Sequence, residues 1–277
     1  MTQLSGTAFT GNRMDDKVCV VTGATQGLGA AIARRLAAAG AAGIVIMGRN
    51  AVKGLAVAGS LPCPALFVQA DFASVEDCQR VIFEADARFG RVDVLVNAGA
   101  STARGTILDT SPDTFDALFA TNVRGPYFLM QAAIKLMIAK GIEGAICNIG
   151  SISALAGQPF INAYCASKGA LTTLTANTAF SVMGNRIRVN QLNVGWMASD
   201  NEREIQAAAG GADWEAKATA ALPFGRLVDP DEAARAVNFL VSDDAGLMTG
   251  AIVNFDQSVW GAVAGPMPVP AGPMRLG

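Results

Sequence analysis

Short continuous runs of apolar residues alternate along the chain with longer stretches in which apolar positions repeat at helical spacing. Such runs, bounded by glycine or polar residues, are typical of strands buried on both faces of a parallel sheet. The predicted strands span residues 18–23, 43–48, 65–71, 92–99, 144–151, 186–195 and 251–256. The predicted helices span residues 28–40, 74–90, 111–141, 162–183 and 229–243. We therefore expect an α/β fold with a doubly wound parallel sheet of about seven strands and helices on both faces.

The spacing of these elements indicates one domain. No linker or internal repeat interrupts residues 14–260, which we assign to a single dinucleotide-binding and catalytic domain. Residues 1–13 are predicted to form a polar tail, and the Gly/Pro-rich residues 261–277 a second tail. Residues 196–225 contain no predicted strand, and a connection of that length is usually a lid or a binding element. We expect this segment to be the substrate loop.

Composition narrows the classes of partner. Hydrophobic residues make up 51% of the 277-residue chain and charged residues 16%, which is enough for a sizeable core. The net charge is −2 and no basic stripe stands out, so nucleic acid is not an expected partner. The longest apolar region, residues 28–47, is interrupted by Arg34 and Arg35, so no membrane span is expected. The first residues contain no apolar run like that of a signal peptide, which favours a cytoplasmic location.

Cysteine and histidine usage bears on metals and on catalysis. The five cysteines form no CxxC pair and the chain has no histidine, so no metal site is expected. An odd number of scattered cysteines fits a reducing compartment. The absence of histidine also raises the question of which side chain would move protons at neutral pH.

The segment TGATQGLG, residues 22–29, joins the first predicted strand to the first predicted helix. Its glycines at 23, 27 and 29 stand where a dinucleotide pyrophosphate would meet free backbone N–H groups and the positive end of the helix dipole. The alternative is a plain tight turn, because a bare glycine pattern is a weak signal. The strand–loop–helix context favours the nucleotide.

The end of the second predicted strand bears on the choice of cofactor. It reads Met47-Gly48-Arg49-Asn50, with an arginine and no carboxylate. A carboxylate there would bind the ribose 2′-OH of NAD(H), whereas a guanidinium suits the 2′-phosphate of NADP(H). The sequence therefore favours NADP(H). NAD(H) stays open as the alternative, because Gln26 stands where a second basic residue would help.

Polar residues also follow the third and fourth predicted strands. Asp71 is placed to bond the adenine amino group, and Asn97-Ala98-Gly99 to lie over the cofactor. The alternative for each is a turn residue that finishes a strand.

The stretch YCASK, residues 164–168, places a tyrosine four residues before a lysine on a predicted helix. Residues i and i+4 share a helix face, so Lys168 should stand beside Tyr164. A free phenol has a pKa of about 10, and a nearby ammonium and a positive nicotinamide would both lower it. A tyrosine made acidic in this way can replace the missing imidazole.

Two further polar residues are candidates for the same crevice. Ser151 ends the fifth predicted strand, where its hydroxyl can hydrogen-bond the reacting oxygen. Asn122 lies inside the predicted helix 111–141, although asparagine is a poor helix former. Its side chain either holds a water that links Lys168 to solvent, or is a solvent-facing or locally bonded polar group.

Taken together, these motifs resemble the short-chain dehydrogenase/reductase superfamily, which has a Rossmann-like fold, over about residues 15–260. The matching features are TGATQGLG, the NAG at 97–99, Asn122, Ser151, YCASK and the TG at 249–250. The resemblance implies that Asn122, Ser151, Tyr164 and Lys168 form a catalytic tetrad. In it Tyr164 is the acid/base, and Lys168 binds the nicotinamide ribose and lowers the pKa of the tyrosine. Ser151 orients the substrate oxygen, and Asn122 holds the relay water.

The resemblance also implies a cofactor site and an assembly. The implied cofactor-binding residues are Gly23, Thr25, Gln26, Gly27, Leu28, Gly29, Arg49, Asp71, Phe72, Asn97, Ala98, Gly99, Tyr164, Lys168, Val194, Gly195, Met197 and Ser199. Members of the family usually form tetramers, so a homotetramer, or a dimer, is expected through helices 111–140 and 162–183 and through the last helix and strand.

The chain departs from the family pattern in two places. After the sixth predicted strand, Val194 stands where proline is usual, and Ser199 where a threonine usually bonds the nicotinamide amide. Near the end of the domain, Asp256-Gln257-Ser258 replaces the usual DGG. This segment and the tail after it either build a subunit contact or reach a neighbour's active site.

The substrate pocket is expected beside residues 100–108, residues 153–162 and the loop from Trp196. The substrate-binding candidates are Ser151, Ser153, Phe160, Tyr164 and Trp196. This mixture of polar and aromatic groups suits a sugar or polyol stacked on an aromatic ring. It suits a cyclic or aromatic ketone about as well, and Trp196 has pure packing as its alternative role.

The expected function is that of an NAD(P)(H)-dependent oxidoreductase that interconverts a secondary alcohol and a carbonyl by hydride transfer, with Tyr164 as the acid/base. The alternative from another class is a non-enzymatic NAD(P)-sensing regulator on the same scaffold. Such regulators often lack the tyrosine or the lysine, and both are present here, which favours the enzyme. A dehydratase or epimerase that uses the same tyrosine is a third alternative.

Overall fold

The computed structural model describes residues 11–155, 158–199, 202–204, 206–207, 211, 213–220 and 222–259. In these residues a seven-stranded parallel sheet has the strand order β3-β2-β1-β4-β5-β6-β7. The strands are β1 (Val18–Thr22), β2 (Gly43–Gly48), β3 (Ala65–Gln69), β4 (Val94–Asn97), β5 (Ala145–Ser151), β6 (Arg188–Val194) and β7 (Ile252–Phe255). The predicted doubly wound sheet is confirmed.

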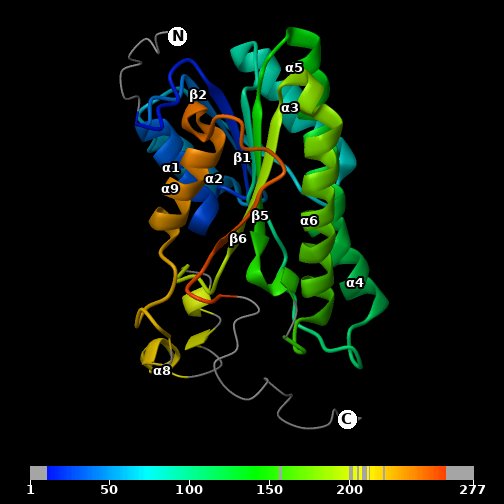
Figure 1. Cartoon of the computed structure of the whole chain (residues 1–277), viewed down its shortest axis with the longest axis vertical. Coiled ribbons are helices and arrows are strands. Elements are labelled where there is room, and N and C mark those ends of the chain that lie inside the picture. Colours follow the sequence, from blue (N-terminus) through cyan, green and yellow to red (C-terminus); the bar gives the residue numbers. More distant parts are fainter. Residues whose placement is uncertain are drawn as a thin grey trace, which may run out of the picture.

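Helices cover both faces of this sheet (Figure 1). One face carries α1 (Gly27–Ala38), α2 (Ala51–Gly59) and α9 (Pro230–Val241). The other carries α3 (Val75–Phe89), α5 (Gly125–Lys140) and α6 (Asn162–Val182), with α4 (Pro112–Phe119) packed against α6.

Alternate residues of the strands pack in two separate hydrophobic cores, one on each face of the sheet. Val21 and Ile46 pack on the side of α1 and α9, whereas their neighbours Val20 and Val45 pack on the side of α3 and α5. All four are fully buried. Because both faces of each central strand are covered, the strands are apolar without interruption, which explains why their positions could be predicted from the sequence.

The predicted helix 111–141 is divided by one wider turn. A π-helical segment, Ala120–Arg124, joins α4 to α5, and the N–H of Gly125 bonds the carbonyl of Ala120. Pro126 has no N–H, so the α-helical hydrogen bond to the carbonyl of Asn122 cannot form. Single π-turns of this kind are frequent at functional sites.

Among the described residues, α2 and α8 (Trp214–Ala220) lie where the sequence predicted no helix. In α2, two glycines, which are poor helix formers, stand among the nine residues AVKGLAVAG, and Gly54 is needed because a Cβ there would lie 2.0 Å from the Phe67 ring of β3. The second helix, α8, lies inside the predicted loop 196–225. That segment therefore contains a helix of its own, and its single buried anchor in α8 is Trp214.

The start of the described chain is attached to the domain. The carbonyl of Asn12 accepts a hydrogen bond from Asn238 of α9, and Met14 is fully buried. Residues 1–10 of the predicted polar tail and the predicted tail 261–277 lie outside the described residues. In the described part of the chain, no helix has both the length and the apolar character needed to cross a membrane.

Candidate active site

The glycine loop forms a close-packed cradle at the carboxyl end of the sheet. Gly23 has a φ of +65°, and a Cβ there would lie 2.5 Å from the Cα of Gly99, after β4. A Cβ on Gly29 would lie 2.4 Å from the carbonyl oxygen of Gly23. The loop after β1, the loop after β4 and the start of α1 therefore touch through backbone alone, and side chains at these positions would separate them.

The N-terminus of α1 has no side-chain cap. Its N-cap residue, Gln26, makes no side-chain hydrogen bond to the helix, although α2, α3, α4 and α9 are each capped by a side chain. The N–H groups of the first turn, at Gly27, Leu28 and Gly29, are thus free to bind an anion, assisted by the helix dipole. A pyrophosphate fits this cradle in both charge and space.

The side chain of Gln26 is directed instead to α2. Its Oε1 accepts a hydrogen bond of 2.7 Å from the Nζ of Lys53, and Thr25 beside it packs against Gly48 at the end of β2. Arg49 follows Gly48 and is exposed. Two cations therefore flank the place where the adenine ribose of a dinucleotide is expected. The sequence reading missed Lys53, because α2 itself was not predicted.

The other candidates along this edge have defined neighbours. The Oδ1 of Asp71 accepts a hydrogen bond from the N–H of Ala73, so this carboxylate does shape a turn. The Phe72 ring is buried against Gly99 and supports the loop after β4. Asn97 is also buried, and its Nδ2 donates to Asn148 at 2.9 Å. Among the described residues, its Oδ1 has no hydrogen-bond partner.

Tyr164, Ser151 and Lys168 meet beyond the end of β5. The phenol of Tyr164 lies close enough to the hydroxyl of Ser151 for that hydroxyl to lower its pKa. The Nζ of Lys168 lies 5.8 Å from the centre of the Tyr164 ring and donates a 2.8 Å hydrogen bond to the carbonyl of Ile149. Like α1, the helix that carries the tyrosine and lysine, α6, begins without a side-chain cap. Three of the four predicted tetrad residues are therefore in one place.

Burial acts on both titratable groups of this cluster. Burial raises the pKa of Tyr164 above that of a free phenol, and the nearby Ser151 hydroxyl acts in the opposite direction. Burial also lowers the pKa of Lys168 to about 8. The expectation that Lys168 and a positively charged nicotinamide together make the phenol acidic stays a prediction, since it includes the charge of the bound cofactor.

Asn122, the fourth predicted tetrad residue, is buried in the π-turn. Its Oδ1 accepts from the N–H of Ser101 at 2.8 Å, and its Nδ2 donates to the carbonyl of Ser101 and to the hydroxyl of Ser167. Both N–H groups of the amide are used, as the alternative of a locally bonded residue expects, and its oxygen accepts one bond. The main-chain carbonyl of Asn122, which Pro126 leaves without its α-helical donor, is a candidate acceptor for a water that leads toward Lys168.

A chain of buried amides supports the strand ends beneath Ser151. Asn148 donates to Thr175, which donates to Gln191, which in turn donates to Asn193 at 2.7 Å. A Cβ on Gly150 would lie 2.0 Å from the Oδ1 of Asn193. These side chains occupy the space next to the main chain that carries Ser151, so they fix its position.

The substrate side of the crevice has two walls. On one, Ser153 is buried and donates to Gln158, while the half-exposed Phe160 lies 5.9 Å below the guanidinium of Arg104. The N–H of Gly105 donates to the carbonyl of Phe160, and the carbonyl of Gly105 accepts from the N–H of Asn162, which holds this wall together.

The second wall begins where β6 ends. Val194 pairs with Ser151 of β5, and Gly195 and Met197 follow it. Trp196 is 40% exposed, lies 6.0 Å from the Trp214 ring, and donates from Nε1 to Glu202 at 2.8 Å. Ser199 lies over the glycine loop, with its Cβ 3.7 Å from the position of a Cβ on Gly27. The first wall thus precedes and begins α6, which carries the tyrosine, and the second follows β6 and reaches the glycine cradle.

Known proteins resemble this chain over most of its length. The family model described as enoyl-(acyl carrier protein) reductase matches residues 23–258. The L-rhamnose 1-dehydrogenase (NAD(P)⁺) of Azotobacter vinelandii is 34% identical over 88% of this chain and 97% of that enzyme. A solved structure described as a short chain dehydrogenase/reductase family protein is 36% identical, covers 88% of this chain and 97% of its own, and has a TM-score of 0.78. The structure of NAD⁺-bound xylitol dehydrogenase is 28% identical over 88% of this chain and 99% of its own, with a TM-score of 0.81.

Proposed function

The chain belongs to the short-chain dehydrogenase/reductase superfamily, as an NAD(P)-dependent oxidoreductase that interconverts an alcohol and a carbonyl, and from this premise we propose that its substrate is a polyol or sugar. We further propose that Tyr164 is its acid/base. The observation that carries this assignment is the meeting of Tyr164, Ser151 and Lys168 beside an uncapped helix start and a glycine cradle.

In this mechanism each residue has one task. The nicotinamide, when bound, supplies or accepts the hydride. Tyr164 takes the proton from the alcohol in oxidation and returns it in reduction, while the Ser151 hydroxyl holds the same oxygen. Lys168, within reach of the tyrosine, binds the nicotinamide ribose, and a water on the carbonyl of Asn122 passes protons to solvent. The backbone N–H groups at the start of α1 hold the pyrophosphate.

A polyol or sugar suits the two walls of the crevice better than a purely apolar ketone does. Hydroxyl groups find partners in Ser153, Gln158 and Glu202, while Phe160 and Trp196 present ring faces. The names of the relatives point the same way, since xylitol is a polyol and L-rhamnose a sugar. The runner-up is a cyclic or aromatic ketone, which the same two rings would also accept.

The test is an oxidation screen of the purified protein. Galactitol, sorbitol, xylitol and L-rhamnose are each supplied with NAD⁺ and NADP⁺, and cyclohexanone and acetophenone with NADH and NADPH, and absorbance at 340 nm is followed. Turnover of a polyol or sugar at least tenfold above that of either ketone supports the proposal. Turnover of the ketones alone would replace it with the runner-up.

We propose NADP(H) as the preferred cofactor. Arg49 lies where a 2′-phosphate is expected, and Lys53 brings a second cation to Gln26. Neither cation has an ion pair with a carboxylate in the described part of the chain. Two cations without acidic partners favour a doubly charged phosphate over a ribose hydroxyl.

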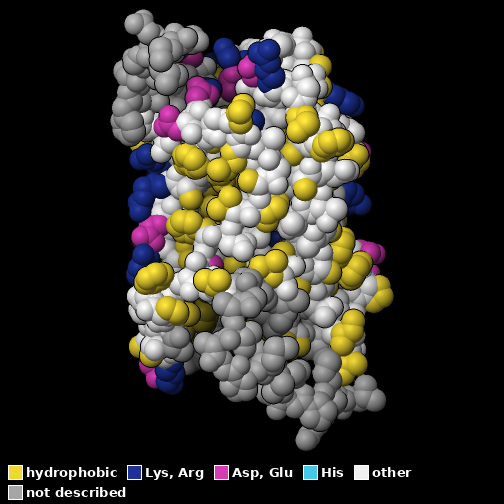
Figure 2. All heavy atoms as spheres, viewed as in Figure 1, with side chains coloured by type: hydrophobic (Ala, Val, Ile, Leu, Met, Phe, Trp, Pro, Cys, Tyr) yellow, Lys and Arg dark blue, Asp and Glu magenta, His cyan; other side chains and the backbone are white. Residues whose placement is uncertain are grey.

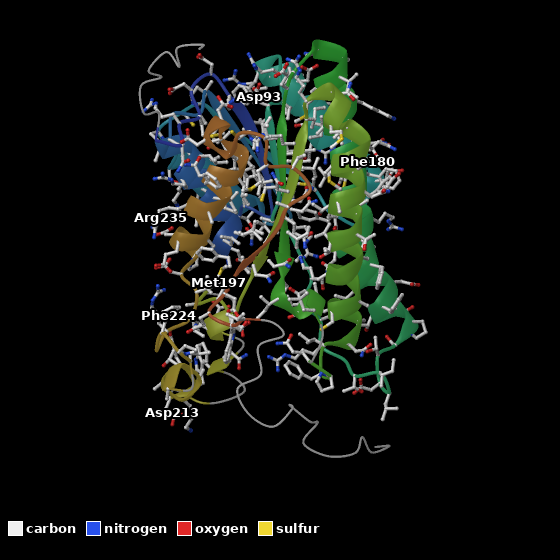
Figure 3. The ribbon with its side chains drawn as sticks, viewed as in Figure 1. Asp93, Phe180, Met197, Asp213, Phe224 and Arg235 are labelled. Atoms are coloured by element: carbon white, nitrogen blue, oxygen red, sulfur yellow. The ribbon has the colours of Figure 1, made fainter. Side chains whose placement is uncertain are left out.

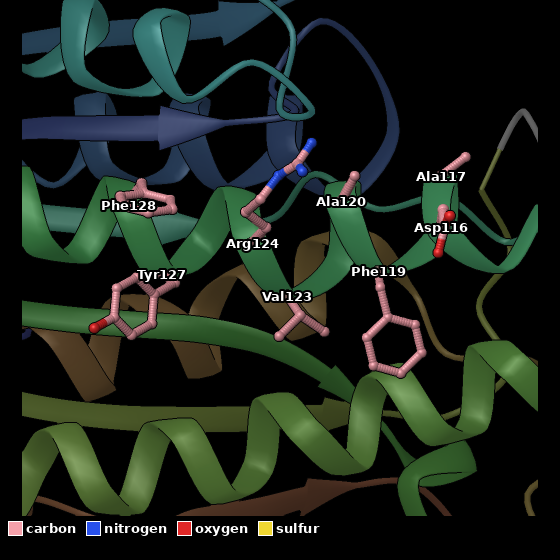
Figure 4. A pocket seen from close by; sticks show the side chains of 8 residues that line it. All are labelled: Asp116, Ala117, Phe119, Ala120, Val123, Arg124, Tyr127 and Phe128. Atoms are coloured by element: carbon pink, nitrogen blue, oxygen red, sulfur yellow. The ribbon is translucent and has the colours of Figure 1, made fainter. Parts of the chain in front are cut away.

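We also propose a homotetramer, or a dimer, of one-domain subunits (residues 14–260) in the cytoplasm. Phe119, Val123 and Tyr127 project from the same side of α4, the π-turn and α5, along a surface hollow of about 780 Å³ (Figure 4). Apolar side chains are also spread over the face made by α9 and the edge strand β7 (Figure 2). A second copy of the chain would cover both surfaces, and light scattering of the purified protein gives the number of subunits.

A further inference from the structure

The residue that departs from the family pattern after β7, Gln257, holds a distant segment of the chain. Its Oε1 accepts a 2.9 Å hydrogen bond from the N–H of Phe224, and its Nε2 donates a 2.7 Å hydrogen bond to the carbonyl of Arg226. The residue between these two, Gly225, turns the chain with a φ of +62°. One side-chain amide therefore bonds the main chain on both sides of this turn, as the backbone of a neighbouring strand would.

The segment held by Gln257 is paired in turn with the start of the substrate wall. The N–H of Val228 donates to the carbonyl of Trp196, and the N–H of Ala198 donates to the carbonyl of Val228, both at 2.9 Å. Leu227 and Val228 are buried. Met197 and Val228 thus form a short parallel bridge, so the segment that leaves β6 (the outgoing limb) is hydrogen-bonded to the segment that leads into α9.

The end of β7 also touches the outgoing limb. The N–H of Gly195 donates to the carbonyl of Phe255 at 3.0 Å, and a Cβ on Gly195 would lie only 1.9 Å from the Oδ1 of Asp256. We call the three segments 195–198, 224–228 and 255–258 the clasp. Met197 and Phe224, from two of its segments, lie at the same end of the molecule, opposite Asp93 (Figure 3).

Trp196 is the part of the clasp that faces the substrate side. Its carbonyl is fixed by Val228, and its indole lies beside the Trp214 ring and donates to Glu202. The clasp thus sets where the second wall of the crevice begins. The predicted tetrad residues lie on β5, α6 and the π-turn, outside the clasp, so a loosened clasp would displace the wall and leave the tetrad in place.

We propose that Gln257 is a positioning residue for substrate binding, which acts through Phe224 and Arg226 to hold Trp196 at the mouth of the crevice. Its effect on substrate affinity rests on the function proposed above, whereas its effect on Trp196 does not. A residue that merely stabilised the fold would lower the stability of the protein and leave the substrate KM unchanged. A positioning residue raises the KM and leaves kcat and cofactor affinity in place.

The test compares Gln257→Ala and Gln257→Glu with the wild-type full-length enzyme. The alanine removes both hydrogen bonds, and the glutamate keeps an acceptor for the N–H of Phe224 but loses the donor to Arg226. Two hydrogen bonds to main chain support about a tenfold rise in the KM for sorbitol in Gln257→Ala. The KM of Gln257→Glu should lie between those of wild type and Gln257→Ala. In both variants kcat and the Kd for the cofactor should stay within about twofold of wild type. The matched control is Gln79→Ala, an exposed glutamine on α3.

A second readout does not require turnover. Acrylamide quenching of tryptophan fluorescence should rise in Gln257→Ala, and the rise should vanish in the double variant with Trp196→Phe. Unchanged quenching and unchanged KM in a folded Gln257→Ala would overturn the proposal. So would an equal loss of kcat and cofactor affinity. If wild type oxidises no polyol, the proposed function fails, and the quenching comparison still decides the role of Gln257.

Discussion

At the amino end of the sheet, charged side chains pair with one another, whereas at the carboxyl end several charged and polar groups have no such partner among the described residues. At the amino end the Nζ of Lys17 lies 2.8 Å from Asp243, and Arg91 lies 2.6 Å from Asp93. Asp93 also accepts a hydrogen bond from the N–H of Val18 at the start of β1. These groups satisfy each other and the strand ends.

The carboxyl end is arranged differently. There α1 and α6 begin without side-chain caps, Arg49 and Lys53 lack carboxylate partners in the described part of the chain, and Lys168 is buried with only a carbonyl to bond. The contrast teaches that the amino end holds the fold together, while the carboxyl end keeps groups available for a ligand at a cost in stability. Substitutions at the two ends should therefore affect different measurements.

The largest effect is expected at Tyr164. Tyr164→Phe removes the hydroxyl that transfers the proton, and kcat should fall at least about a hundredfold while cofactor affinity stays near wild type. Steady-state kinetics with the substrate found in the screen, and fluorescence titration with the cofactor, measure the two quantities. Tyr127→Phe, on the exposed side of α5, is the matched control, and full activity of the Tyr164 variant would refute its assignment as the acid/base.

The cost of burying Lys168 should appear as a pH dependence of stability. Its pKa is about 8 in the folded protein and about 10.5 in the unfolded chain, so between these values only the unfolded chain holds the proton. The free energy of unfolding of wild type relative to Lys168→Met should therefore rise with pH, by roughly 3 kcal/mol from pH 8 to 10.5. Urea titrations at several pH values measure it, and a difference that does not change with pH would contradict a lowered pKa.

A substitution at the amino end of the sheet should lower the stability of the protein and leave its activity unchanged. Asp93→Ala leaves the buried N–H of Val18 without its acceptor and should lower the free energy of unfolding by about 2 kcal/mol. The kcat/KM should not change, since the site lies at the other end of the sheet. Asp15→Ala, which breaks an exposed pair with Arg13, is the control and should have little effect. A loss of activity in folded Asp93→Ala would mean that the two ends are coupled.

The smallest effect is expected in cofactor choice. Arg49→Ala should weaken NADP(H) binding about tenfold more than NAD(H) binding, because a charge-assisted hydrogen bond to the 2′-phosphate is lost. Lys53→Met should shift the preference in the same direction by less, and Lys135→Met, exposed on α5, serves as its control. Equal losses for both cofactors would show that neither cation recognises the 2′-phosphate.

The sequence predicted the sheet, and it named the candidate site residues, because both depend on local pattern. Buried strands are continuous apolar runs, and Gly23, Tyr164 and Lys168 stand at fixed offsets within motifs. The elements missed were those whose reason is tertiary. Gly54 suits α2 only because Phe67 lies beneath it. Lys53 could be recognised as a neighbour of Gln26 only once that helix was known.

The electrostatics could not be predicted in the same way. The spacing of Tyr164 and Lys168 gives their proximity but not their burial, and burial is what raises the pKa of one and lowers that of the other. The contacts of Gln257 join residues more than thirty positions apart, and no periodic pattern carries that information.

The π-turn at Asn122 has a further consequence for the surface of the protein. In a regular α-helix, residues four apart are rotated by about 40° from each other, so a row at that spacing winds around the helix. The wider turn at 120–124 takes up part of this rotation, and Phe119, Val123 and Tyr127 stay in line (Figure 4). Without the wider turn, eight regular α-helical steps would separate Phe119 from Tyr127 by about 80° around the axis, and the aromatic pair Phe115 and Phe119 would point to a different side of the helix from Tyr127. The same π-turn thus holds the buried Asn122 at the site and keeps Phe119, Val123 and Tyr127 aligned on the outer surface of the helix.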